Sequence, residues 1–364
     1  MADKEEMVRN LTNHYTYKVE KAYENNYASS KALEVIAKSL KEIYRYFEPC
    51  FFEGDFYMCK NLNDEDCLDE GSFTLLYDKN ILLNRNSGTL VIQVFNDDSK
   101  ICFSENQNIE NLMAKQNSTL VYHFKNNKEY FYANGETVDI TFYNSGSRFA
   151  TQFNDLIGAL NDYAAKKIRQ GSCGHFSQSW SSTDSKRLFF KGGGRGNNIP
   201  EKFMQESLYE FLDSNFTRGV SMESSREFNI SGDYSKPKPV DVKVTWREAN
   251  RTALIEVKFM GAVKKESDGE IYNLSDPRAN KGITQLKGYH DSVKSDLPTT
   301  IIKSYLVVID GRRNNLTTTQ TTINTTDGMY FKDTEIIIDD DKKFHETIQG
   351  FEKPIRMFVE PICS

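Results

Sequence analysis

The chain has 364 residues, about the length of two ordinary domains, and 38% of them are hydrophobic and 27% charged. A net charge of −6 argues against a protein that coats nucleic acid by bulk charge alone, although it permits one with a local basic groove. Because no apolar run approaches the ~20 residues that span a bilayer, and because the charged N-terminus lacks the apolar core of a secretory signal, we expect a cytoplasmic protein without a membrane segment.

The first fifty residues carry a helical pattern. Ser29 or Ser30 can cap a helix that runs to about residue 47, and a weaker pattern of the same kind precedes it over residues 7–27. The apolar positions that define the stronger helix are Ala32, Leu33, Ile36, Ala37, Leu40, Ile43, Tyr44 and Phe47. The two segments predict a helical hairpin that packs either on its own domain or on a second copy of the chain.

Residues 72–144 consist of short β-branched and aromatic runs separated by Asn, Asp, Gly and Lys, which predicts an antiparallel β meander with one exposed face. A helix over residues 147–170 follows it. Residues 1–170 are therefore predicted to form an α+β region, a helical hairpin plus a meander. No motif in this region carries chemistry, so we interpret it as a sensor, recruitment or DNA-contacting region, with a purely structural role as the alternative.

Residues 171–198 are rich in Gly and Ser, and we expect them to link two domains. Their segment "KRLFFKGGGRG" is either a flexible linker or a loop that lies along a phosphate backbone. The chain contains no C-x-x-C pair, so its cysteines are expected to be reduced. Cys173 and His175 are two residues apart, but without a second pair at finger spacing a zinc site is only the lesser alternative.

The second domain, residues 199–364, alternates helices with strands, which predicts an α/β fold with a mixed central sheet. Helices are expected over 198–216 and 279–295, and strands over 239–246, 251–260, 303–311, 335–340 and 355–362. The first two strands form a hairpin through the polar turn "REAN".

This hairpin concentrates charged residues at one end of the sheet. Asp241 stands early in its first strand and Glu256 late in its second, and the period-two alternation of a strand places Glu256 and Lys258 on the same face. Two carboxylates at one place bind a hard divalent cation such as Mg²⁺ or Mn²⁺, for which the Val257 carbonyl is a further candidate ligand. Such a cation polarises a phosphodiester, and a nearby lysine can orient the attacking water.

The residues "PVD", followed one hairpin later by "EVK", resemble the motif of the PD-(D/E)xK nucleases, which have the restriction-endonuclease-like fold. The usual Pro-Asp is Pro-Val-Asp here. The resemblance covers residues 199–313 and implies that Asp241 and Glu256 bind metal while Lys258 assists the attacking water.

Two flanking helices extend the resemblance. "QLKGY" is similar to the Q-x-x-x-Y motif of the RecB-type branch and offers Gln285 and Tyr289, which could instead form hydrogen bonds within the core. The preceding helix implies a further catalytic and metal-binding glutamate. Glu206 is the preferred candidate because it lies in the middle of that helix, and Glu201 and Glu210 are the alternatives.

The resemblance implies a Mg²⁺-dependent deoxyribonuclease, with Mn²⁺ able to substitute for Mg²⁺. An endonuclease is favoured because no helicase-like element accompanies the domain, and a homodimer or higher oligomer would suit cleavage of both strands. By analogy of architecture, the protein would be a bacterial restriction or anti-phage effector. The alternatives are a non-catalytic nucleic-acid-binding or assembly module and a nuclease gated by a nucleotide or protein partner at residues 1–170. Arg312 and Arg313 follow a buried strand, where a DNA phosphate contact and an ordinary turn are equally compatible with the sequence.

Overall fold

The computed structural model describes residues 27–67, 73–76, 82, 87–103, 112–113, 115, 117–141, 147, 149–171, 174–182, 184, 186–192, 199–216, 220–224 and 240–364. The chain forms two compact units, residues 1–154 and 155–364. The division falls inside helix α4 (Gln152–Tyr163), and a π-helical turn, η3 (Ala164–Ile168), continues that helix. The protein is a mixed α/β structure with a mixed sheet in each unit.

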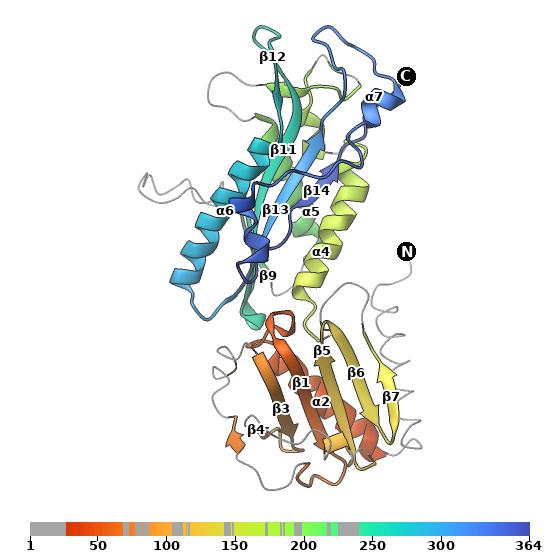
Figure 1. Ribbon diagram of the computed structural model, residues 1–364, viewed down its shortest axis with the longest axis vertical. Coiled ribbons are helices and arrows are strands. Elements are labelled where there is room, and N and C mark those ends of the chain that lie inside the picture. The colour runs from red at the N-terminus through yellow and green to blue at the C-terminus, as the bar shows by residue number, and fades with distance from the viewer. Residues whose placement is uncertain are drawn as a thin grey trace. The chain divides into compact units, whose positions relative to one another are not determined.

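The first unit contains a seven-stranded sheet with the strand order β2-β4-β3-β1-β5-β6-β7. Its described elements are α2 (Tyr27–Ile43), η1 (Pro49–Phe51), β1 (Glu53–Asn61), β2 (Phe73–Leu75), β3 (Ser87–Val94), β4 (Lys100–Phe103), β5 (Thr119–Lys125), β6 (Lys128–Ala133) and β7 (Glu136–Asp139). Helix α2 covers one face of the sheet (Figure 1). Its Ile36 and Leu40 belong to the same buried cluster as Phe56 and Tyr122 of the sheet.

The predicted helix before residue 47 is confirmed as α2, because its apolar stripe is buried against the sheet. The first helix of the expected hairpin lies outside the described residues, apart from Tyr27. The expectation of a wholly antiparallel meander is wrong for one strand pair, since β1 and β3 run parallel. The expected exposed face is wrong for the central strands, because consecutive residues of β1, β3 and β5 are buried on both faces. Their backbones approach so closely that a Cβ on Gly54 would lie 1.9 Å from the Gly88 carbonyl oxygen.

The second unit is built on the strand order β14-β13-β11-β10-β9, with β12 and β8 also pairing with β11. The bounds of its strands are β8 (Phe190–Gly192), β9 (Val220–Ser224), β10 (Val242–Trp246), β11 (Arg251–Lys265), β12 (Ile271–Leu274), β13 (Ile301–Gly311) and β14 (Ile355–Phe358). Its remaining elements are η4 (Gly174–Ser179), α5 (Ile199–Asn215), η6 (Arg247–Ala249), α6 (Asp276–Asp296), α7 (Thr325–Met329), η7 (Asp340–Lys342) and η8 (Phe344–Glu346).

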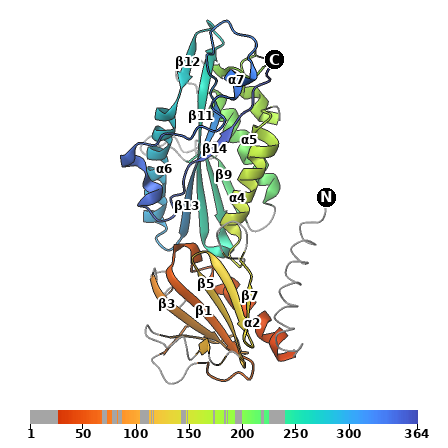
Figure 2. The same cartoon turned by 45° about the vertical axis from the view of Figure 1, so that its right-hand side comes forward.

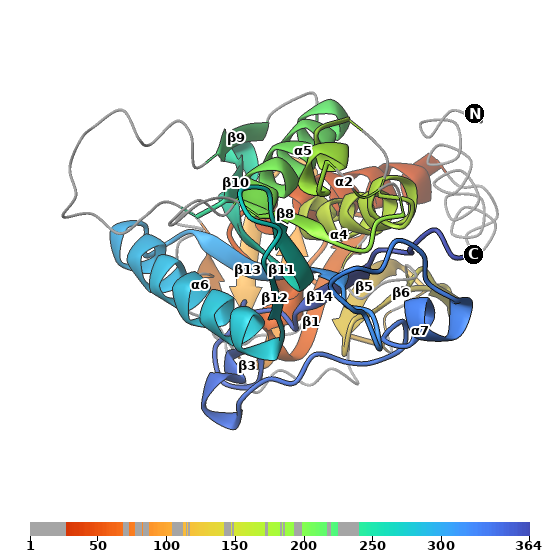
Figure 3. The same ribbon diagram turned by 90° about the horizontal axis from the view of Figure 1, so that it is seen from above.

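Helix α6 covers one face of this sheet, and α4 and α5 cover the other (Figure 3). The sheet is mixed as predicted, because β11, β13 and β14 run parallel while β9 and β10 are antiparallel to their neighbours. Strand β11 lies at the centre and continues five residues beyond the expected 251–260, with its first thirteen residues buried. In Figure 2 this long strand can be followed through the middle of the unit.

The segment expected to link two domains belongs instead to the second unit in its described parts. Phe176, Trp180 and Phe190 are buried, and Trp180 stacks on Phe190 with ring centroids 4.4 Å apart. Strand β8 from this segment pairs with the C-terminal end of β11. The glycines Gly193, Gly194 and Gly196 of the proposed phosphate-contacting loop lie outside the described residues.

The strand expected over residues 335–340 is absent, since residues 335–339 are described and irregular. Side chains of α6 satisfy the backbone of this segment in place of a neighbouring strand. Asp276 accepts from the Ile337 N–H at 3.1 Å, while Asn280 donates to the Ile337 carbonyl at 3.1 Å and accepts from the Asp339 N–H at 3.0 Å. The apolar pattern therefore reflects packing on α6 rather than a strand.

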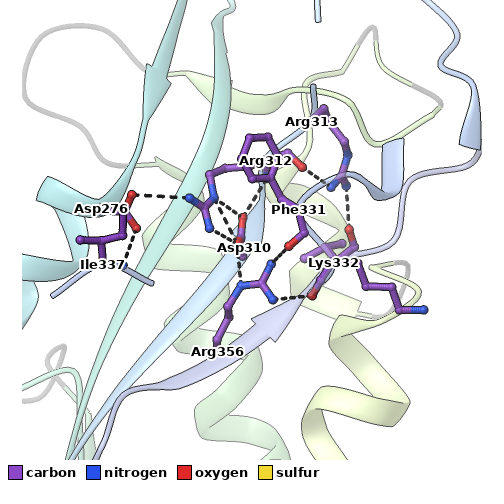
Figure 4. A network of polar contacts seen from close by, with 9 residues as sticks. Asp276, Asp310, Arg312, Arg313, Phe331, Lys332, Ile337 and Arg356 are labelled. Carbon is purple, nitrogen blue, oxygen red and sulfur yellow. Dashed lines mark hydrogen bonds and ion pairs between the residues drawn. The ribbon is translucent and has the colours of Figure 1, made fainter. Parts of the chain in front are cut away.

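A network of polar contacts closes the C-terminal end of β13 (Figure 4). The carboxylate of Asp310 is fully buried, and it accepts hydrogen bonds from the guanidinium groups of Arg312 and Arg356. Arg312 also lies 3.6 Å from Asp276, and Arg313 is buried with a hydrogen bond to the Val359 carbonyl. Because Arg312 and Arg313 are engaged within the fold, the structure supports the ordinary turn rather than a phosphate contact.

Candidate metal centre

Three buried carboxylates converge in the second unit from distant parts of the sequence. Glu201 lies in the first turn of α5, Asp241 directly precedes β10, and Glu256 lies within β11. Each side chain offers one oxygen, and these oxygens lie within 4.8 Å of one another. The β10–β11 register pairs Val242 with Ile255, so the next residues outward, Asp241 and Glu256, stand opposite each other. This convergence confirms the predicted proximity of Asp241 and Glu256.

Lys258 supplies a cation to the cluster. It lies two residues after Glu256 on the same face of β11, and its Nζ is 2.5 Å from an oxygen of both Glu201 and Glu256. The same ammonium donates to the Val257 carbonyl at 3.3 Å. Burial lowers the pKa of Lys258, but the negative charges of Glu256, Glu201 and Asp241 outweigh it and raise the pKa above its ordinary value. Lys258 is therefore an ammonium ion at neutral pH.

Asp241 is held in place by two hydrogen-bond donors. The side-chain amide of Gln205 donates to Oδ1 at 2.7 Å, and the backbone N–H of Val257 donates to Oδ2 at 2.7 Å. Burial, followed by the charge of Glu256, raises the pKa of Asp241 well above its ordinary value. Burial also raises the pKa of Glu256, although Lys258 opposes the shift. A divalent cation would reverse both shifts, since it favours the ionised carboxylates.

The glutamate supplied by α5 is Glu201, so the preference for Glu206 is corrected. At 3.6 residues per turn, Gln205 lies about 40° around the helix from Glu201 and Glu206 about 140°. Glu206 consequently faces His175, with its Oε2 3.5 Å from Nδ1, and Glu210 lies 2.9 Å from Nε2 of the same histidine. The helical spacing in the sequence could have indicated Glu201. It lies three residues before position 204 and seven before position 208, on the helix face whose apolar residues are buried.

Helix α6 presents a third set of residues to the site, at helical spacing along one side: Arg278, Gly282, Gln285 and Tyr289. Arg278 donates a hydrogen bond to Oε2 of Glu201, a contact that the sequence did not reveal. Gly282 lets the helix approach Lys258, since a Cβ at this position would lie 2.6 Å from Cγ of the lysine.

Gln285 and Tyr289 line a cleft of about 910 Å³ beside α6. The wall that faces the helix includes Ile337, Asp339 and Lys342. Burial raises the pKa of Tyr289, and the charges of Glu256 and Asp241 raise it further, which places its hydroxyl within the electrostatic reach of the carboxylates. Tyr289 is therefore close to both the carboxylate cluster and the cleft, whereas Gln285 is placed only at the cleft.

The residues present fit a hard divalent cation. The set of donors consists of carboxylate oxygens, which Mg²⁺ and Mn²⁺ prefer. Oε2 of Glu256 is buried and has no hydrogen-bond partner among the described residues, so it is available for a further cation. With a cation bound and all three carboxylates ionised, Lys258 and Arg278 would leave one negative charge among these five side chains to balance the metal. A ligand role for the Val257 carbonyl stays a prediction.

A scan against protein-family models found no match, and neither the curated proteins nor the solved structures that were searched contain a significantly similar protein. The resemblance to PD-(D/E)xK nucleases therefore depends on the motif residues and on the geometry described above. In the part of the chain that the structure describes, no helix is both long and apolar enough to cross a membrane.

Proposed function

We propose that this protein is a metal-dependent nuclease that hydrolyses phosphodiester bonds in DNA, with Mg²⁺ or Mn²⁺ held by Glu201, Asp241 and Glu256. The observation that carries the proposal is the convergence of three buried carboxylates and one lysine from α5, the hairpin and β11 at a single place. Burying three carboxylates together costs free energy because they lose their hydration. Such clusters are typical of sites that bind a cation or carry out catalysis. A purely structural ion pair would not need the third carboxylate.

The metal, when bound, would polarise the phosphodiester and lower the pKa of a bound water molecule. The protein's own residues orient the reactants. Gln205 and the Val257 N–H hold the Asp241 carboxylate in one orientation, and the buried Glu256 presents its unpartnered oxygen to the same space. These contacts fix the ligands before the substrate arrives, which is the condition for efficient electrostatic catalysis.

We assign Lys258 the role of a hydrogen-bond donor and a positive charge beside the carboxylates, because its ammonium donates to Glu201 and Glu256 in the metal-free structure. An ammonium at this position can orient the attacking water and stabilise negative charge on the phosphate in the transition state. As the water oxygen bonds to phosphorus, the P–O bond to the leaving sugar oxygen would break; the attacking water would lose a proton to solvent, and the leaving oxygen would take one from a second water molecule.

We infer that a nucleic acid strand approaches along the cleft beside α6, which is lined by Tyr289 but by none of the three carboxylates. Its lining carries the amide of Gln285, the phenol of Tyr289 and the exposed ammonium of Lys281. These groups can contact a phosphate backbone without reading its sequence. By analogy of architecture, we infer that the protein is an endonuclease of restriction or anti-phage defence and that it acts as a dimer or higher oligomer.

The test is cleavage of closed circular, linear and single-stranded DNA by the purified protein with Mg²⁺ and with Mn²⁺. We expect the wild type to cut and Glu201→Gln and Glu256→Gln to lose at least a hundredfold in rate, because each removes a charged ligand. Glu206→Gln, on the same helix as Glu201, is the matched control and should retain the wild-type rate.

Cutting of the closed circle would identify an endonuclease, while degradation only of linear DNA would favour an exonuclease. Equal activity of Glu201→Gln and Glu206→Gln would overturn the assignment of the α5 glutamate. A wild type that binds DNA but cuts none of the three forms with either metal would favour the non-catalytic binding module.

A further inference from the structure

We propose that Arg278 is a positioning residue that holds Glu201 as a ligand when the metal displaces Lys258. This inference rests on the proposed metal site and assigns a role to a residue outside the recognised motif. Arg278 lies in the first turn of α6, 77 positions after Glu201 in the chain, and its guanidinium donates to Oε2 of that carboxylate. The side chains of both residues are largely buried, with 15% and 5% of their surfaces exposed.

The two oxygens of Glu201 have different partners. Oε1 accepts from the Lys258 ammonium at 2.5 Å, and that ammonium also contacts Oε1 of Glu256 at 2.5 Å. A divalent cation that takes Oε1 of Glu201 as a ligand would compete with the Lys258 ammonium for that oxygen, while Oε2 of Glu256 is free to bind it without competition. The hydrogen bond from Arg278 is made to the other oxygen and can persist through the exchange.

The position of Arg278 conflicts with ordinary helix preferences. The positive end of the helix dipole disfavours a cation in the first turn, where acidic residues are usual. Arg278 is nevertheless held there between the Glu201 carboxylate and the ring of Phe259, whose centroid lies 6.0 Å from the guanidinium carbon. Its Nε is buried without a hydrogen-bond partner among the described residues. A residue that departs from local helix preference and is held by contacts to a buried carboxylate and a buried ring is the kind of exception found at functional sites.

The role predicts a definite change in metal affinity. Partners that orient a metal ligand typically contribute 10- to 100-fold to affinity. We therefore expect Arg278→Met to bind Mn²⁺ at least tenfold more weakly than the wild type in calorimetric titration, although loss of a positive charge alone would strengthen binding. Arg278→Lys, which keeps one donor, should recover part of the loss. Arg247→Met, in the exposed η6 turn, is the matched control and should bind like the wild type.

A double-mutant cycle separates a role through Glu201 from a direct effect of charge. If Arg278 acts through this carboxylate, Arg278→Met should change Mn²⁺ affinity less than twofold in a Glu201→Gln background. Stronger or unchanged binding by Arg278→Met, or an equal loss in both backgrounds, would overturn the proposal. Circular dichroism and thermal unfolding establish that each variant is folded. If Arg278→Met fails to fold, the same cycle is made with Arg278→Lys. This variant is expected to lose threefold or more in Mn²⁺ affinity only when Glu201 is present.

The titration needs no substrate, so it tests the metal site and the role of Arg278 separately from cleavage of DNA. A wild type that binds no Mn²⁺ would refute the metal-centred function and the role of Arg278 together. A wild type that binds Mn²⁺ and cuts DNA, beside an Arg278→Met variant of undiminished affinity, would refute only the role of Arg278.

Discussion

Replacing Lys258 with Met should make the second unit dependent on metal for its stability. The ammonium is the only cation that contacts both Glu201 and Glu256 in the described structure, and the three side chains are 3–6% exposed. Met keeps the length and apolar character of the lysine stem and removes the charge. Glu256 then has no cationic partner among the described residues, while Glu201 keeps the guanidinium of Arg278.

The expected loss follows from the burial of the pair. Removing one partner of a buried ion pair destabilises a protein by about 3–5 kcal/mol, because the remaining charge is left uncompensated. Mn²⁺ at a hundred times its dissociation constant stabilises the folded state by about 2.7 kcal/mol. In the wild type the cation must displace the ammonium, but in Lys258→Met it meets no competitor. Mn²⁺ should therefore restore most of the lost stability in the variant and stabilise the wild type less.

Urea unfolding followed by tryptophan fluorescence provides the assay. Both tryptophans, Trp180 and Trp246, belong to the unit formed by residues 155–364, so the signal reports the unit that holds the site. Wild type, Lys258→Met and the control Lys294→Met, an exposed lysine at the end of α6, are compared in EDTA and in Mn²⁺. Equal stability of wild type and Lys258→Met in EDTA, or an equal gain of both from Mn²⁺, would refute the reasoning.

Three further predictions concern other contacts. Gly282→Ala should destabilise the second unit by about 1–3 kcal/mol and slow cleavage, because the added Cβ would overlap the Lys258 side chain. Unchanged urea unfolding of this variant would contradict the close approach of α6 to Lys258. Asp310→Asn should lower the free energy of unfolding by about 3–5 kcal/mol in the same assay, since Arg312 loses its buried counter-ion. A decrease under about 1 kcal/mol, which is typical of a surface ion pair, would argue that this pair is not buried. Burial lowers the pKa of His123, so the folded state favours the neutral imidazole and loses stability as the pH falls below about 6.5. In thermal unfolding, His123→Asn should lose less stability between pH 7 and pH 5 than the wild type does. The same pH dependence in both proteins would count against a role of His123 in this loss.

The hairpin could be predicted from the sequence because its geometry is local. Asp241 and Glu256 are fifteen residues apart, and strand alternation together with one short turn is enough to bring them together. The central sheet was predicted as mixed for a similar reason, since its strands and helices alternate. The parallel pairing of β11 with β13 and of β1 with β3 follows from long-range packing, which no local pattern contains.

The rest of the site was missed for identifiable reasons. Arg278 precedes the helix expected over 279–295, whereas α6 begins three residues earlier at Asp276, so the sequence placed this arginine in a loop. Glu206 was preferred for its central position in α5, although the burial of the helix face decides which glutamate reaches the sheet. The absent strand at 335–340 shows the same limit, because apolar alternation does not say whether the partner is a strand or a helix.

The attachment of residues 335–339 to α6 has an evolutionary consequence. This wall of the cleft is fixed by hydrogen bonds between its backbone and the side chains of Asp276 and Asn280, not by a ladder of backbone bonds with a strand. Exposed positions of this wall such as Ile337 can therefore change without shifting the register of the central sheet or the carboxylates within it, whereas Ile336 and Ile338 pack on the core. Related chains could acquire new substrate preferences by substitutions at such exposed positions while the chemistry of the site stays the same.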